Sequence, residues 1–129
     1  MKLQLLSYKL AISKLSPADV IPKWATQGEF FCICKTDEEL SIVCSEILVP
    51  NSVQSNKGWK GIKVVGPLDF SLTGILSQLV TCLAEEKISI FAVSTFDTDY
   101  LLIKEQNFQK AIDVLRAVGH TFIDMNPLL

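Results

Sequence analysis

The sequence predicts an α+β fold of two successive modules, in which antiparallel sheets carry helices on one face and the first module is curtailed. In the second half, a strand, helix, strand, strand, helix and strand follow one another, and both helical segments have the apolar period of core-facing helices. The first half offers strands and a short helical segment but no clear second helix. With 49% apolar residues, the 129-residue chain is long enough for one ordinary domain or two small modules that share a core.

The first half is expected to contain three strands and one short helix. Residues 16–19, Ser-Pro-Ala-Asp, are typical of a helix cap, so a short helix is predicted to follow and to end near Pro22 or Trp24. The polar residues 36–38 have the length and composition of a hairpin turn, which makes the strands on either side antiparallel. The predicted strands are residues 3–15, 29–35 and 39–49.

A linker is predicted at residues 50–57, which are polar, rich in small residues and entered through a proline. The boundary is therefore placed between a first module of residues 1–56 and a second of residues 57–129. Residues 59–65 are predicted as a strand that stops at Gly66-Pro67, because proline cannot donate to a sheet ladder.

The second half has the clearest periodicity in the chain. One helix is predicted from apolar residues spaced as on one helical face, and a second from Asn107 as N-cap to Gly119 as its left-handed C-terminal residue. Strands are expected at residues 88–95, 100–104 and 121–125, with a tight reversal at residues 96–99. The apolar residues of the first helix are Leu72, Ile75, Leu76, Leu79, Val80, Leu83 and Ala84.

Composition argues against several classes of function. A formal net charge of −2, with Arg116 the single arginine, provides no basic stripe for nucleic acid. No apolar run is long enough to span a bilayer and the start does not resemble a signal peptide, so a cytoplasmic protein without membrane contact is expected. His120 is the one histidine and is expected at the surface near a helix C-terminus. Four cysteines in apolar runs are expected to be buried, reduced and structural, so no metal or cofactor is predicted: Cys32, Cys34, Cys44 and Cys82.

The most informative stretch is residues 66–76, which read as a strand that ends in a turn and opens a helix. Unpaired backbone N–H groups and the positive end of the helix dipole would meet there at one exposed place. Such a place suits a small anion, and a carboxylate group is the predicted ligand.

Residues 36–44, 66–76 and 88–105 together resemble the ACT-domain family, specifically the tandem-ACT subfamily that includes the CASTOR arginine sensors. The resemblance implies ferredoxin-like β-α-β-β-α-β regulatory modules that bind amino acids, most often where two modules pack side by side. This chain has two ACT-like halves, whereas CASTOR sensors resemble a doubled version with four. The resemblance therefore implies a homodimer or a larger homo-oligomer, but not the same ligand.

Two segments match the positions that the resemblance assigns to the ligand. The turn and helix start would receive a carboxylate through backbone N–H groups, and a side chain at Gly74 would stand between ligand and backbone. The second segment ends a neighbouring strand, where Asp97 is the favoured partner of an ammonium group and Asp69 is the alternative. The predicted ligand-binding residues are Asp69, Phe70, Ser71, Thr73, Gly74, Ile75, Ser94, Thr95, Phe96, Asp97 and Thr98.

The acidic residues and Ser71 in these segments also have a purely structural interpretation. Asp69 and Ser71 are suited to cap a helix N-terminus, and Asp97 and Asp99 are suited to a hairpin turn.

The predicted function is non-catalytic: a regulatory module in which a free amino acid, held at an ACT–ACT interface, controls association of subunits or of a regulated protein partner. The alternative is a structural or protein-interaction module that keeps the ACT scaffold without a ligand. An enzyme is the least supported class, because no nucleophile–base pair or metal set is visible.

Overall fold

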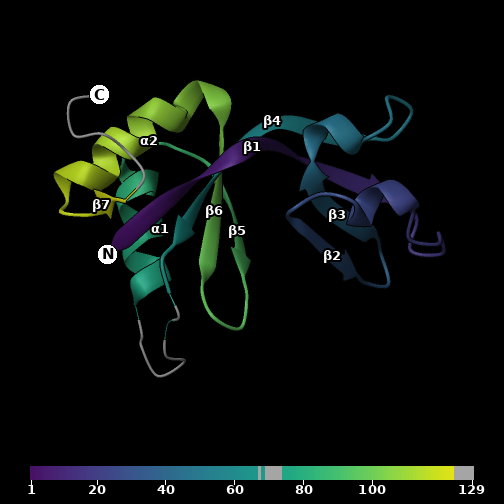
Figure 1. Cartoon of the computed structure of the whole chain (residues 1–129), viewed down its shortest axis with the longest axis horizontal. Helices are drawn as coiled ribbons and strands as arrows, with labels where there is room; N and C mark the ends of the chain where they lie inside the picture. The colour runs from purple at the N-terminus through teal and green to yellow at the C-terminus, as the bar shows by residue number, and fades with distance from the viewer. Residues whose placement is uncertain (67, 69–73, 124–129) are drawn as a thin grey trace. The chain divides into compact units, whose positions relative to one another are not determined.

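The computed structural model, shown in Figure 1, describes residues 1–66, 68 and 74–123. The chain divides into two compact units: unit 1 comprises Met1–Ser7 and Lys60–Leu129, and unit 2 comprises Tyr8–Trp59. Two strands, β1 (Lys2–Leu15) and β4 (Ser55–Val64), each contribute residues to both units. The module boundary between residues 56 and 57 stays a prediction.

Unit 1 has the predicted β-α-β-β-α-β order. After β4 come α1 (Ile75–Glu85), β5 (Ile90–Ser94), β6 (Asp99–Lys104), α2 (Glu105–Ala117) and β7 (Thr121–Phe122). β5 and β6 form an antiparallel hairpin, and β6 neighbours β4. The start of β1 lies between β4 and β7 and pairs in parallel with β7. Unit 1 is therefore an α+β module, and the start of β1 supplies the fifth strand of its sheet.

Both helices of unit 1 pack on the same apolar cluster. Alternate residues of β1, β4 and β6 face the helices, and Figure 1 shows α1 and α2 together beside these strands. Burying this surface is the main force that holds helices and sheet together. The fully buried side chains of the cluster are Leu3, Ile62, Val64, Leu79, Leu83, Leu101, Ile103, Ala111 and Leu115.

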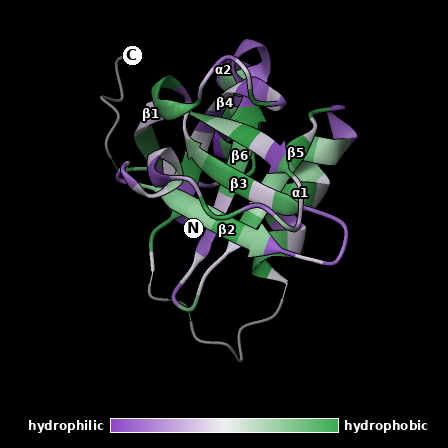
Figure 2. Cartoon of the chain, turned by 90° about the vertical axis from the view of Figure 1, so that its right-hand side faces the viewer, coloured by the Kyte–Doolittle hydropathy of each residue, from purple (hydrophilic) through white to green (hydrophobic). Residues whose placement is uncertain are grey.

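Unit 2 contains the curtailed module. β3 (Leu40–Ser45) pairs antiparallel with both β1 and β2 (Phe31–Lys35), which confirms the predicted hairpin. Two short 3-10 helices, η1 (Lys23–Thr26) and η2 (Glu46–Leu48), take the place of a full helical layer. A small apolar cluster lies among η1, β1 and β3, and Figure 2 shows hydrophobic residues along β2 and β3.

The structure corrects two helix starts. Residues 16–19 form a turn, in which Asp19 N–H donates to the Ser16 carbonyl at 3.0 Å, and the helical turn begins only after Pro22. The second long helix begins at Glu105, because Lys104 ends β6 and serves as N-cap with no side-chain hydrogen bond. The predicted cap Asn107 therefore lies within the first turn.

The end of α2 agrees with the sequence. Gly119 has φ +100°, its N–H donates to the Arg116 carbonyl at 3.0 Å, and His120 N–H donates to the Leu115 carbonyl at 3.1 Å. These are the two hydrogen bonds of a Schellman motif, which glycine favours because it has no Cβ penalty at positive φ.

Several strand boundaries also differ from the prediction. β4 starts at Ser55, inside the predicted linker, and β3 stops at Ser45, where η2 begins. β5 and β7 are shorter than predicted, and residues 124 and 125 of the predicted last strand lie outside the described residues.

The four cysteines are free thiols, but their burial differs from the prediction. Cys44 is buried, Cys32 and Cys82 are half-buried, and Cys34 is exposed on β2. Burial raises the pKa of Cys32, Cys44 and Cys82, and the neighbouring Cys34 raises that of Cys32 further. A raised pKa disfavours the thiolate, so these three thiols are poorly reactive at neutral pH.

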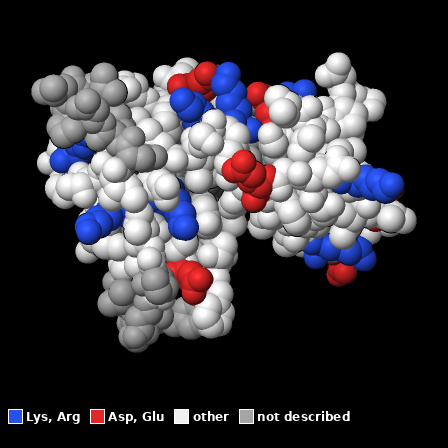
Figure 3. Space-filling view, in the orientation of Figure 1, with Lys and Arg blue, Asp and Glu red and all other residues white. Residues whose placement is uncertain are grey.

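The surface charge is mixed. On the face drawn in Figure 3, the basic and acidic side chains of the described residues are interspersed. Within the described part of the chain, no helix is long and apolar enough to cross a membrane.

His120 makes the stability of unit 1 sensitive to acid. Burial lowers its pKa below the usual 6.5, and the Met1 ammonium, 3.1 Å from its Nδ1 atom, lowers it further. The unfolded chain then binds this proton more tightly, so the contribution of His120 is complete above about pH 6.5 and is lost as the pH falls through the lowered folded pKa. We expect the melting temperature to fall less on acidification in His120→Gln than in the wild type. An equal fall in both proteins would contradict this assignment.

Candidate functional site

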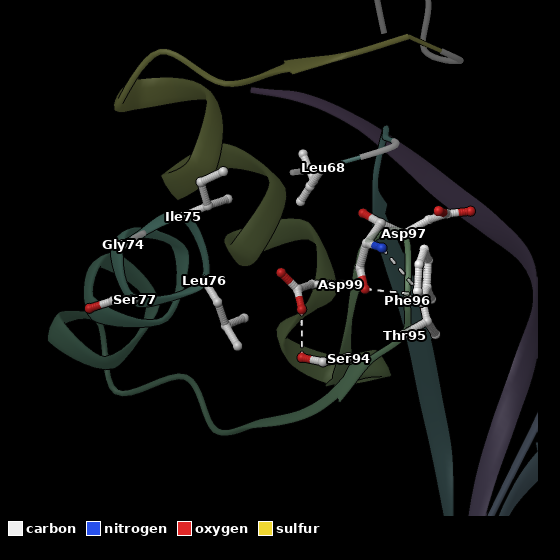
Figure 4. A pocket seen from close by; sticks show the side chains of 11 residues that line it. Leu68, Gly74, Ile75, Leu76, Ser77, Ser94, Thr95, Phe96, Asp97 and Asp99 are labelled. Carbon is white, nitrogen blue, oxygen red and sulfur yellow. Dashed lines mark hydrogen bonds between the residues drawn. The ribbon is translucent and has the colours of Figure 1, made fainter. Parts of the chain in front are cut away.

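A cavity of about 270 Å³ lies in unit 1 between the start of α1 and the β5–β6 turn. Figure 4 shows the helix start on one side of this space and the turn on the other. The cavity is lined by Leu68, Gly74, Ile75, Leu76, Ser77, Ser94, Thr95, Phe96, Asp97, Thr98 and Asp99.

Hydrogen bonds within the β5–β6 turn hold the turn side of the cavity. Thr95 N–H and its hydroxyl both donate to the Thr98 carbonyl, at 2.8 and 3.1 Å, and Thr98 N–H donates back to the Thr95 hydroxyl at 3.2 Å. This arrangement confirms the predicted reversal between the two strands, and short hydroxyl side chains suit it because they bond to nearby backbone.

The turn is also fixed to the end of β4. The buried Thr98 hydroxyl donates to the Val64 carbonyl at 2.5 Å, and Leu68 N–H donates to the Asp97 carbonyl at 2.6 Å. Gly66 is needed here, because a Cβ at this position would lie only 3.0 Å from the Asp97 carbonyl oxygen. These contacts set the position of the turn against the segment that leads to α1.

The helix side of the cavity presents a positive pole. Gly74, the N-cap of α1, has φ +79° and provides no capping side chain, and its carbonyl accepts from Gln78 N–H at 2.8 Å. The first N–H groups of a helix have no partner within the helix, and the dipole adds partial positive charge there. Apart from its neighbours in the chain, no described atom lies within 4 Å of the place that a Cβ on Gly74 would occupy.

The opposite wall carries a carboxylate that is held in place. Ser94 and Asp99 are directly paired across β5 and β6, and the Ser94 hydroxyl donates to Asp99 Oδ1 at 2.5 Å. Asp99 alternates with Leu101 and Ile103, which belong to the core cluster, so its side chain lies on the helix-covered face of the sheet. Figure 4 shows its carboxylate between Leu76 and Ser94.

The predicted ligand-binding residues fall into two groups. Gly74 and Ile75 lie on the wall formed by α1, and Ser94, Thr95, Phe96, Asp97 and Thr98 lie on the wall formed by the turn. Asp69, Phe70, Ser71 and Thr73 lie outside the described residues, so the choice between Asp69 and Asp97 stays open. Contact of any of these residues with a ligand stays a prediction.

Asp99 lines the cavity but is not among the predicted ligand-binding residues, because turn chemistry was favoured for both Asp97 and Asp99. Asp99 lies two and four residues before the core residues Leu101 and Ile103, but Leu102 is equally apolar and buried, so the sequence pattern alone does not place Asp99 on the helix side. Asp97, by contrast, is exposed on the turn, and its backbone carbonyl is already bonded to Leu68.

The cavity is not assembled like a metal centre. Within residues 1–66, 68 and 74–123, no group of three or more His, Cys, Asp or Glu side chains is placed to hold a metal ion. What the described walls offer is a helix N-terminus, a fixed carboxylate, hydroxyl groups and apolar side chains such as Leu76 and Phe96.

Comparison with known proteins identifies relatives of both halves. Residues 54–117 match the family model described as the ACT domain, and a separate model of an N-terminal domain matches residues 8–52. The cytosolic arginine sensor for mTORC1 subunit 1 of Mus musculus is 30% identical over 113 residues, which cover 74% of this chain and 34% of the sensor. The chain thus spans about a third of the length of that relative.

Solved structures give a closer match over the whole chain. Protein Atu0741 from Agobacterium tumefaciens is 40% identical, with a TM-score of 0.90, and the match covers 95% of this chain and 91% of that one. The regulatory subunit of aspartate kinase from Thermus thermophilus has a TM-score of 0.64 at 8% identity, covering 91% of this chain and 97% of that one. At 8% identity, the similarity to the aspartate kinase subunit shows a shared fold and nothing more.

Thr98 is expected to stabilise the site through its buried hydroxyl. Thr98→Val keeps the shape of the side chain but leaves the Val64 carbonyl without this donor, which should cost about 1–3 kcal/mol of unfolding free energy. Urea denaturation measures the loss, and Thr121→Val, at an exposed position of β7, serves as the control with a change within about 0.5 kcal/mol. Equal stability of the two variants would show that the Thr98 hydroxyl is not needed.

Proposed function

Since this chain belongs to the ACT-domain family and is a distant relative of the cytosolic arginine sensors, we propose that it is a non-catalytic regulatory module that binds a free amino acid in the cavity of unit 1. The proposal rests on one observation: the cavity has the N-terminus of α1 on one wall and the Asp99 carboxylate on the other.

The two poles match the two charges of an amino acid. The α-carboxylate would accept from the N–H groups at the start of α1, where the helix dipole favours a negative group. The α-ammonium would donate to Asp99, whose orientation the Ser94 hydroxyl fixes. The ligand's side chain would then lie against Leu76 or Phe96, which supply apolar surface near the two poles.

Regulation would follow from a difference in affinity between two states. We propose that the ligand lies at an interface between ACT modules of a homodimer or larger assembly, and that it binds one packing arrangement more tightly than another. The ligand then stabilises the favoured arrangement by that difference, typically about 1–3 kcal/mol, and so controls association with another copy or with a protein partner.

A thermal-shift screen against the twenty amino acids tests the function directly, with arginine first because the mouse relative is an arginine sensor. A ligand present at about 100 times its dissociation constant should add roughly 2.7 kcal/mol to stability. Sedimentation with and without the ligand then tests the control of association. If no amino acid stabilises the folded protein, the interaction module without a ligand becomes the better description.

Gly74→Leu should abolish binding of the amino acid found in the screen, because the new side chain would stand at the helix start, where the ligand's carboxylate is proposed to bind. Gly58→Leu is a matched control: Gly58 has φ +81°, close to the +79° of Gly74, open space around a Cβ, and a position outside the cavity. Each leucine should cost about 1–2 kcal/mol of backbone strain. Calorimetry that shows equal affinity in both folded variants would contradict the proposed site.

Asp99→Asn should lower the affinity for the same ligand at least about tenfold, because a weaker neutral contact replaces a charge-assisted hydrogen bond to the ammonium group. Asp97→Asn is the matched comparison on the exposed turn, and its affinity should stay within about threefold of the wild type. If Asp97→Asn lowered the affinity more than Asp99→Asn, Asp97 would be the partner of the ammonium group, as the sequence alone favoured.

A further inference from the structure

A second cavity, of about 440 Å³, lies in unit 2 and shares no residue with the first. Its walls come from three separate segments: the end of β1, the start of β3 and the start of β4. The polar residues that matter for its chemistry are Lys14, Glu39, Ser41, Ser55 and Lys57.

Strand register explains why this cavity is polar although it adjoins a core. Leu15 and Leu40 are paired across β1 and β3 and belong to the apolar cluster of unit 2. Lys14 is paired with Ser41, and these two residues are the immediate chain neighbours of Leu15 and Leu40. Because successive side chains of a strand alternate between faces, Lys14 and Ser41 lie on the face away from the apolar cluster.

The third wall is joined to this face by the backbone. Lys14 N–H donates to the Gln54 carbonyl at 3.0 Å, which places the segment that begins β4 beside Lys14. Ser55 and Lys57 follow on that segment and, being two residues apart on a strand, share a face. The residues that carry the ammonium and hydroxyl groups of the cavity therefore lie on strands, and a backbone hydrogen bond joins two of its walls.

The charge balance of the cavity differs from that of the chain. Two lysines and one glutamate line it, whereas the whole chain has a formal net charge of −2. Ser41 and Ser55 add two hydroxyl groups to its lining, and both residues are half-buried. Ammonium and hydroxyl groups that line one cavity are donors suited to an anion with several oxygen atoms.

We propose that this cavity is a second binding site, for a small oxyanion in which a phosphate or carboxylate group accepts from Lys14, Ser41 and Ser55 and is attracted by Lys57. It is distinct from the proposed amino-acid site, because its lining residues all belong to unit 2 and none of them lines the other cavity. A volume of about 440 Å³ leaves room for an organic group attached to the anion.

Nuclear magnetic resonance titration of the full chain tests the proposal, with inorganic phosphate and, separately, succinate as probes. Sodium chloride at matched ionic strength corrects for screening. We expect saturable amide shifts confined to residues 12–14, 39–41 and 54–57. Saturation by phosphate alone or by succinate alone identifies which oxyanion the site takes.

Lys14→Met should lower the affinity for the anion that binds by about tenfold, as expected for the loss of one charged donor. Ser41→Ala should lower this affinity by a smaller factor. Lys35→Met is the matched control, since it removes an exposed lysine of β2 that does not line the cavity. The proposal fails if neither probe saturates, if shifts centre on Gly74 and Ile75 instead, or if Lys14→Met and Lys35→Met bind alike. Lys14 is exposed, so its loss should leave the fold intact, and Ser41→Ala provides an independent check.

Discussion

The site of unit 1 depends on how the β5–β6 turn is attached to the end of β4. Two hydrogen bonds make this attachment, from the Thr98 hydroxyl to the Val64 carbonyl and from Leu68 N–H to the Asp97 carbonyl. Both join segments far apart in sequence, and one of them involves a buried hydroxyl. A carbonyl left without such a donor in an apolar environment is costly, so the turn is held against the end of β4 and Leu68.

The parts of the fold that the sequence predicted well are those with a long hydrophobic period. The apolar face of α2 packs in the core cluster, and burial of the same residues produces both the sequence pattern and the structure. The Schellman end at Gly119 was equally predictable, because positive φ strongly selects glycine.

The errors occurred where short-range chemistry competed with the tertiary context. Asn107 is a good cap by type, but β6 runs to Lys104 and passes directly into α2, so the helix has already begun at Asn107. Residues 55–57 have linker composition, but pairing within the sheet draws them into β4. In both cases the sheet ladder decided a boundary that local propensity could not.

The choice between the two acidic residues of the turn shows the same competition within the site. Local chemistry favoured Asp97, whereas strand alternation puts Asp99 on the helix-covered face and pairs it with Ser94. The walls of this cavity come from elements that are not consecutive, α1 and the β5–β6 turn. A ligand that engages both poles would fix the turn against the helix, and neither pole alone would do so. Under the proposed function, that requirement would favour a zwitterion over a simple anion, and occupancy of the cavity would change the surface that the module presents to a partner.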